Sequence, residues 1–166
     1  MRIIIVDWGI FVNQEIMQDR DFKLWTMLYQ ARDTILKVRK KELYKYDLSF
    51  MQANVLFAIE ANGGKASIND LSKWTFRNLN AIHVIVASMV RGGLLSKSKV
   101  PGKNAHLISL TDKGREAYEQ SLKIESIREV LSCLSEEERK QLWVTLGKLR
   151  DKALKSVSSE ILLPFP

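Results

Sequence analysis

The chain has 166 residues, 46% of them hydrophobic, and 26 Lys and Arg residues against 19 Asp and Glu residues give a net charge of +7. This hydrophobic content supports a packed core and excludes a disordered basic protein, and the length fits one domain with helical extensions. The basic balance favours a polyanionic partner, either nucleic acid or an anionic membrane surface.

Both ends of the chain are apolar, and we expect residues 1–18 to form an arm and residues 156–166 a tail. Asp7 interrupts the first apolar run and no small-residue cleavage site follows, so we expect no signal peptide. The run is also too short to span a membrane. The single cysteine, Cys133, leaves no partner for an intramolecular disulfide and is typical of a reducing cytoplasm. We therefore expect a cytoplasmic protein with no membrane partner.

Helical periodicity predicts a first long helix from about Asp19 to Leu43. Its apolar stripe consists of Phe22, Trp25, Leu28, Tyr29, Leu36 and Val38. It ends in the charged cluster Arg39-Lys40-Lys41-Glu42, which we expect to be a solvated face. A second helix begins at Ser49, with Gln52 at the capping-box position, and stops at residues 62–64, Asn-Gly-Gly.

Two short helices follow. Ser67, with Asp70 three residues later, is expected to cap the third helix, and Asn78 a fourth that runs to Arg91. Apolar residues predict an inward stripe on the fourth helix: Leu79, Ile82, Val86, Met89 and Val90. The outer side then carries Asn80, Ala81, His83, Val84, Ala87 and Ser88.

A β-hairpin is predicted next, with strands at residues 94–99 and 106–110 and a turn at residues 100–104. Two short helices and a basic hairpin are a device for placing one helix in the major groove of DNA. The charge agrees, because residues 65–106 hold seven basic residues and one acid, a balance of +6. The segments before and after balance at +1 and 0.

The remaining chain predicts two helices. Thr111 is expected to cap a long helix that extends to about Leu131, and residues 135–138 form a capping box for the last helix. That helix has a coiled-coil-like seam of Leu142, Leu146, Leu149 and Ala153. A small winged domain cannot cover these stripes, so we expect a two-fold dimer in which the same surfaces pair.

The predicted fold class is α+β and predominantly helical: a winged helix-turn-helix with N- and C-terminal dimerisation helices. Five segments are expected along the chain. They are an apolar arm at 1–18, an N-terminal dimerisation helix at 19–47, a DNA-binding domain at 48–111, C-terminal dimerisation helices at 112–155, and an apolar tail at 156–166.

Three motifs occur in a fixed order: Arg91-Gly92-Gly93-Leu94-Leu95, then Leu110-Thr111-Asp112-Lys113-Gly114-Arg115-Glu116, then Leu134-Ser135-Glu136-Glu137-Glu138. With this set, residues 20–153 resemble the MarR family of bacterial and archaeal transcription regulators. The resemblance implies a homodimer with one winged reading head on each side. It also implies binding to a pseudo-palindromic operator of double-stranded DNA, often under the control of a small molecule.

The chain departs from the family pattern at two places. The family wing commonly carries Asp-x-Arg, whose Arg enters the minor groove, whereas this chain has Gly102-Lys103-Asn104. In mid-helix the family often has Thr-Arg, and this chain has His83-Val84. We therefore expect a different set of base contacts and a target sequence of its own.

Within the basic residues 65–106, we expect two classes of DNA contact, to phosphates and to bases. Phosphate contacts are assigned to Lys73, Arg77, Lys97, Lys99 and Lys103. Base contacts are assigned to Asn78, Asn80 and His83. Ala81 and Asn104, the latter at the position of the family's wing Arg, are also expected to bind DNA. Two alternatives stay open, since Asn78 can serve only as a helix cap and Asn80 can be a solvated polar residue.

Other residues favour structural roles. Trp74 is expected to pack against the second helix rather than to touch DNA, and Cys133 to be a buried structural thiol rather than a redox sensor. By analogy with the family, an effector pocket would be lined by Trp25, Tyr29, Arg32 and Phe57, although core packing explains each of them as well. The sequence has no catalytic motif, and we expect no enzyme activity, no cofactor and no metal site.

The sequence thus predicts a sequence-specific DNA-binding transcription regulator, a repressor relieved by a small-molecule effector. Two alternatives remain. The winged helix could be an interaction module for protein or RNA, which the absent wing Arg favours, or the protein could bind DNA non-specifically as an architectural protein.

Overall fold

The computed structural model describes residues 14–99, 102 and 106–157, and these form two compact units whose boundary follows Lys37, within α2. The first unit holds α1 (Gln14–Gln18) and most of α2 (Arg20–Tyr44). The carboxylate of Asp19 accepts a hydrogen bond from the backbone N–H of Phe22 at 2.7 Å, which caps α2. The predicted bounds of the first long helix are therefore confirmed to within one residue.

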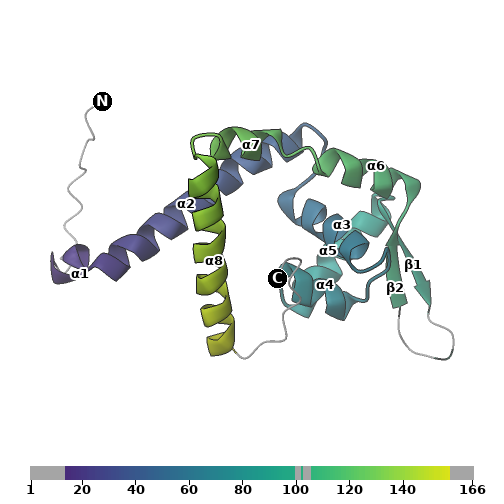
Figure 1. The fold of residues 1–166 in the computed structure, drawn as a ribbon. Helices are drawn as coiled ribbons and strands as arrows, with labels where there is room; N and C mark the ends of the chain where they lie inside the picture. The colour runs from purple at the N-terminus through teal and green to yellow at the C-terminus, as the bar shows by residue number, and fades with distance from the viewer. Residues whose placement is uncertain (1–13, 100–101, 103–105, 158–166) are drawn as a thin grey trace. The chain divides into compact units, whose positions relative to one another are not determined.

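The second unit, from Val38 onward, contains the winged helix. Its elements after α2 are α3 (Phe50–Ala61), α4 (Ile68–Thr75), α5 (Leu79–Arg91), β1 (Leu95–Lys99), β2 (His106–Leu110), α6 (Asp112–Ser121), α7 (Glu125–Leu131) and α8 (Glu136–Val157). Figure 1 shows α3, α4, α5 and α6 gathered beside the β1–β2 hairpin. The predicted class, mainly helical with one small antiparallel hairpin, is confirmed.

Side-chain caps begin the helices where the sequence predicts them. In each case a side-chain oxygen accepts a hydrogen bond from the backbone N–H three residues later, and the caps are Ser49, Ser67, Asn78, Thr111 and Ser135. The capping box is complete at three of the five, because a side chain three residues on accepts from the cap's own N–H.

The hairpin pairs Leu95 with Leu110 at its base and Lys99 with His106 toward its tip. Ala66, just before α4, adds a bridge to β2, with backbone N···O distances to Ile108 of 3.0 and 2.9 Å. The hairpin is thereby attached to the helix-turn-helix on the side of β2. Of the predicted turn at 100–104, only Gly102 is among the described residues.

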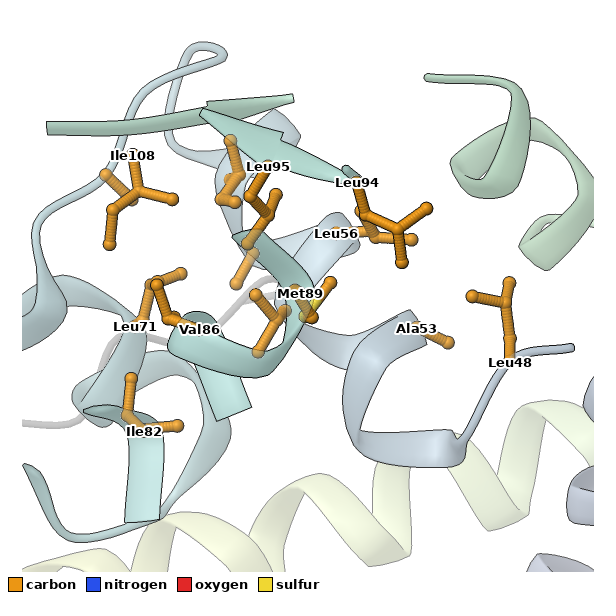
Figure 2. Close-up of a cluster of buried hydrophobic side chains, with 14 of the residues drawn as sticks. Leu48, Ala53, Leu56, Leu71, Ile82, Val86, Met89, Leu94, Leu95 and Ile108 are labelled. Carbon is orange, nitrogen blue, oxygen red and sulfur yellow. The ribbon is translucent and has the colours of Figure 1, made fainter. Parts of the chain in front are cut away.

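One hydrophobic core lies between the helices and the hairpin. Figure 2 shows Leu56, Leu71, Val86, Met89, Leu95 and Ile108 pointing toward one another from three helices (α3, α4 and α5) and both strands. Helix α3 is the centre of this core, because α4, α5, α6 and β2 all pack against it. Five of its twelve residues are buried, spread over most of its circumference.

The inward stripe of α5 is narrower than predicted. Ile82, Val86 and Met89 are buried, but Leu79 and Val90 are 46% and 36% exposed. Leu79 is the first residue of the helix and Val90 the last but one, and three residues at spacings of four and three already fill the contact with the core. The prediction for these two terminal residues is wrong.

The prediction of one long helix from Thr111 to Leu131 is also wrong, since this stretch is broken into α6 and α7 at residues 122–124.

Helix α8 has no buried residue, and its seam residues Leu142, Leu146 and Leu149 are 39–45% exposed. Among the described residues, no helix is long and apolar enough to cross a membrane.

Candidate nucleic-acid interface

The turn between α4 and α5 sets the direction of the candidate recognition helix. Phe76 ends α4 in the left-handed conformation, with φ of 56°. The hydroxyl of Ser72 donates a hydrogen bond to the carbonyl of Arg77, and the N–H of Arg77 donates to the carbonyl of Ser72. Because both bonds join α4 to the turn, the start of α5 is held in a fixed orientation relative to α4.

Helix α5 presents its polar and small residues outward, as the sequence predicts. Asn80, His83, Val84, Ala87 and Ser88 are exposed. Ala81 is half-buried, because it sits on the margin between this outer face and the core-facing one. The outer face therefore offers amide, imidazole and apolar groups of modest size, which are the side-chain types that read base edges in a major groove.

Asn78 has a confirmed structural role. Its side-chain oxygen accepts a hydrogen bond from the N–H of Ala81 at 2.9 Å and so caps α5. The residue is nevertheless exposed. Its amide NH₂ is the only part of the side chain that the cap does not use, so a base contact by Asn78 stays a prediction.

Most of the predicted phosphate-contacting cations lie on the surface. Arg77 is exposed just before α5, and Lys97 and Lys99 are exposed on β1. Lys73 is half-buried and already engaged in an interaction within the protein. Lys103 and Asn104 lie outside the described residues. Arg77 and the two strand lysines are thus the described cations best placed for a backbone contact.

Trp74 packs in the interior, as predicted. Its ring meets Phe57 of α3 edge-on, with centroids 6.3 Å apart and an interplanar angle of 76°. Edge-to-face contacts of this kind stabilise aromatic pairs. The indole N–H is buried without a hydrogen-bond partner among the described residues. Trp74 therefore belongs to the support of the helix-turn-helix.

The predicted effector-lining residues are divided between the two units. Trp25, Tyr29 and Arg32 lie in the first unit and are exposed, and Arg32 pairs with Asp33 at 2.7 Å. Phe57 lies in the second unit, half-buried against Trp74. None of the four lines the two described cavities of about 240 and 510 Å³, which belong to the second unit. Their role in effector binding stays a prediction.

The structure reveals a buried polar cluster that the sequence interpretation missed. Arg39 and Glu42 are buried, so the expectation that residues 39–42 form a solvated face is wrong for these two. Arg39 donates to Glu42 at 2.6 Å, to the carbonyl of Lys123 at 3.1 Å and to that of Ser121. In the sequence, only their spacing of three residues on a helix pointed to an ion pair between them.

The environment of Glu42 keeps its carboxyl ionised. Burial by itself raises its pKa, but hydrogen bonds from Ser126 and Arg39, together with the positive charge of Arg39, outweigh burial and lower the pKa below its ordinary value. Ser126 bonds to Glu42 through both its hydroxyl and its N–H. The carboxylate thus joins α2 to the first turn of α7.

Cys133 is exposed, so the prediction of a buried thiol is wrong. The residue follows α7 in a tight turn, where its Sγ donates to the carbonyl of Val130 at 3.1 Å and faces solvent. Within the part of the chain that the structure describes, no group of three or more His, Cys, Asp or Glu residues is arranged to hold a metal ion.

No protein-family model and no curated protein sequence matches this chain. Solved structures do match. The ligand-free organohalide-sensing transcriptional regulator RdhR aligns with a TM-score of 0.82 at 24% identity, covering 98% of this chain and 99% of that one. A structure of RdhR with bound 2,4-dichlorophenol aligns equally well.

Two structures with bound DNA are also similar. A mutant MarR from E. coli in complex with operator DNA aligns with a TM-score of 0.71 at 20% identity, covering 76% of this chain and 93% of that one. The MepR–DNA complex from S. aureus aligns with a TM-score of 0.70 at 21% identity, covering 81% and 99%. The chain therefore has the winged-helix fold of the MarR-type transcription regulators.

Proposed function

We propose that this protein is a MarR-family transcription regulator that binds double-stranded operator DNA in a sequence-specific manner. The observation that carries the proposal is the outer face of α5, where polar and small side chains are exposed on a helix fixed by the turn after α4. A helix presented in this way fits a major groove, in which each base pair offers a distinct pattern of donors, acceptors and methyl groups.

Charge supports the same surface. Residues 65–106 carry nearly all of the chain's excess positive charge. Within them, Arg77 is exposed just before α5, and Lys97 and Lys99 are exposed on the strand that follows it. Cations that flank a recognition helix contact phosphates, which supplies affinity and orientation without reading sequence. We assign base contacts to Asn80 and His83, with Ala81 and the free NH₂ of Asn78 beside them.

We infer that the working form is a homodimer. The first unit and α8 expose large apolar side chains, among them Trp25, Met27, Trp143 and Leu146. Apolar surface of this extent marks an interaction site, and a two-fold axis lets the same surfaces cover each other. A dimer also presents two recognition helices to a pseudo-palindromic operator, one to each half-site.

We further propose that a small-molecule effector relieves repression. Among proteins of this fold, RdhR is seen with bound 2,4-dichlorophenol, and DNA binding by BpsR of Bordetella bronchiseptica is regulated by 6-hydroxynicotinic acid. An effector that binds better to a conformation with misplaced recognition helices would weaken DNA binding by its differential affinity. Trp25, Tyr29, Arg32 and Phe57 are the residues proposed to line its site.

The test is fluorescence anisotropy of the purified protein on the DNA upstream of its own gene and on a scrambled duplex, each titrated with salt. We expect a preference of about 10³-fold or more for the upstream DNA, with two subunits per duplex. Equal and steeply salt-dependent binding to both duplexes would point to a non-specific architectural role. Absence of binding to either duplex would favour a protein or RNA partner.

A further inference from the structure

Val84 is the large apolar residue of α5 that is most exposed to solvent. Its exposed fraction is 70%, while Ile82 and Val86, two residues before and after it, are 0% and 4% exposed. At 100° per residue, Val84 lies about 200° around the helix from each of them. Its side chain therefore projects from the side of α5 opposite to the core, in the middle of the outer face.

The side chains around Val84 on the surface of α5 are short. Its neighbours at three and four residues' distance are Asn80, Ala81, Ala87 and Ser88. None of these four is longer than Asn, so no long or charged side chain stands at the positions next to the isopropyl group. The centre of the outer face is a small apolar surface with amide and hydroxyl groups at its borders.

Folding does not require valine at this position. Valine is β-branched and has a lower helix propensity than alanine, and a side chain that stays in solvent gains little from burial in return. An exposed valine at the centre of a recognition surface is instead suited to contact with another apolar group. In the major groove of DNA, that group is the C5-methyl of thymine.

We propose that Val84 reads a thymine methyl group in each operator half-site and so determines part of the sequence preference. This inference rests on the proposed function, since it requires α5 to enter the major groove. The polar residues of the outer face recognise donors and acceptors, whereas Val84 discriminates T·A from pairs that lack a methyl group at that edge.

The experiment uses the full-length protein and duplexes selected by it from a random library. Each thymine of the selected consensus is replaced in turn by deoxyuridine, which removes only the methyl group, and affinities are measured by anisotropy for wild type and V84A. V90A is the matched control, because it makes the same chemical change on the same helix at its far end. V84T, which keeps one methyl group, is a second variant, and thermal unfolding confirms that each variant is folded.

At one thymine per half-site, we expect deoxyuridine to weaken wild-type binding by about fourfold and V84A binding by less than about 1.5-fold. V90A should behave as wild type and V84T should fall between wild type and V84A. If no thymine position distinguishes wild type from V84A, the role of Val84 is overturned while the proposed function stands. If selection yields no consensus, the proposed function fails and the inference on Val84 fails with it.

Discussion

The guanidinium of Arg39 lies 2.6 Å from the carboxylate of Glu42. Arg39 binds to the end of α6 and Glu42 binds to the start of α7, on either side of the break between these helices. Arg39 donates to the carbonyl of Ser121, the last residue of α6, and to that of Lys123 in the break, while Glu42 accepts from Ser126 in the first turn of α7. The residue at the N-cap position of α7 makes no side-chain cap of its own. The ion pair on α2 therefore caps both helices across the break.

Loss of one partner should leave the other charge buried and uncompensated. We expect Glu42→Ala to lower the free energy of unfolding by about 3 kcal/mol or more. The control is Asp33→Ala, which removes the acid of the exposed pair with Arg32 and should change stability by less than about 1 kcal/mol. Urea unfolding at one fixed protein concentration measures both. Equal effects of the two variants would contradict a capping role for the buried pair.

The stabilisation by Glu42 should depend on pH. Its folded-state pKa is lowered, so its contribution is present above the unfolded pKa and is lost as pH falls through the folded value. We expect the stability difference between wild type and Glu42→Gln to be constant near neutral pH and to shrink below about pH 4. Urea midpoints of both proteins between neutral and acid pH provide the measurement. A difference that grew toward acid pH would show the opposite sign of the pKa shift.

Gly114 has no room for a side chain. A Cβ built on it would lie 2.0 Å from the carbonyl oxygen of Leu94, which is backbone at the start of the wing. We expect Gly114→Ala to destabilise the protein by about 3 kcal/mol or more, because α6 must move away from the hairpin. Gly92→Ala is the control, since its Cβ would meet backbone atoms only at 3.5 Å or beyond and should be tolerated. Thermal unfolding compares the two, and similar midpoints would refute the close approach.

The cations of β1 and the amide of Asn80 should act differently on DNA binding. We expect Lys97→Ala and Lys99→Ala each to weaken binding to operator and random duplexes alike and to reduce the salt slope by about one. Asn80→Ala should instead weaken binding to the operator alone and thus lower the discrimination. Salt-dependent anisotropy on both duplexes separates the classes. A lysine variant with an unchanged salt slope would remove that residue from the phosphate contacts.

The exposed seam of α8 should be needed for assembly. Leu146 and Leu149 are 44% and 45% exposed, and we expect Leu146→Glu combined with Leu149→Glu to convert the dimer to a monomer of about 19 kDa. Glutamate on this apolar stripe would place charge in the interface, where desolvation disfavours it. Sedimentation at micromolar concentration gives the mass. A wild-type monomer would contradict the homodimer itself.

Features that depend on neighbours in sequence were predictable. Each of these helix caps joins a side chain to a backbone N–H only three residues away, so the residue pattern around Ser67 or Asn78 was enough to predict where the helix begins. The outward side of α5 follows in the same way from the periodicity of 3.6 residues. The candidate recognition surface was accordingly predictable in outline.

Features that depend on contacts distant in sequence were not. At the break after Ser121, Arg39 and Glu42, about 80 residues earlier in the chain, make hydrogen bonds to backbone groups that the interrupted helix leaves without their helical partners. The same contacts bury two charges that local reasoning assigned to solvent. Sequence by itself therefore determined where the helices with side-chain caps begin and which face of α5 is polar, since those are local properties of the chain. Only the tertiary structure decided where the helix predicted after Thr111 is interrupted and which charges are buried, because burial and long-range hydrogen bonding arise when remote segments pack together.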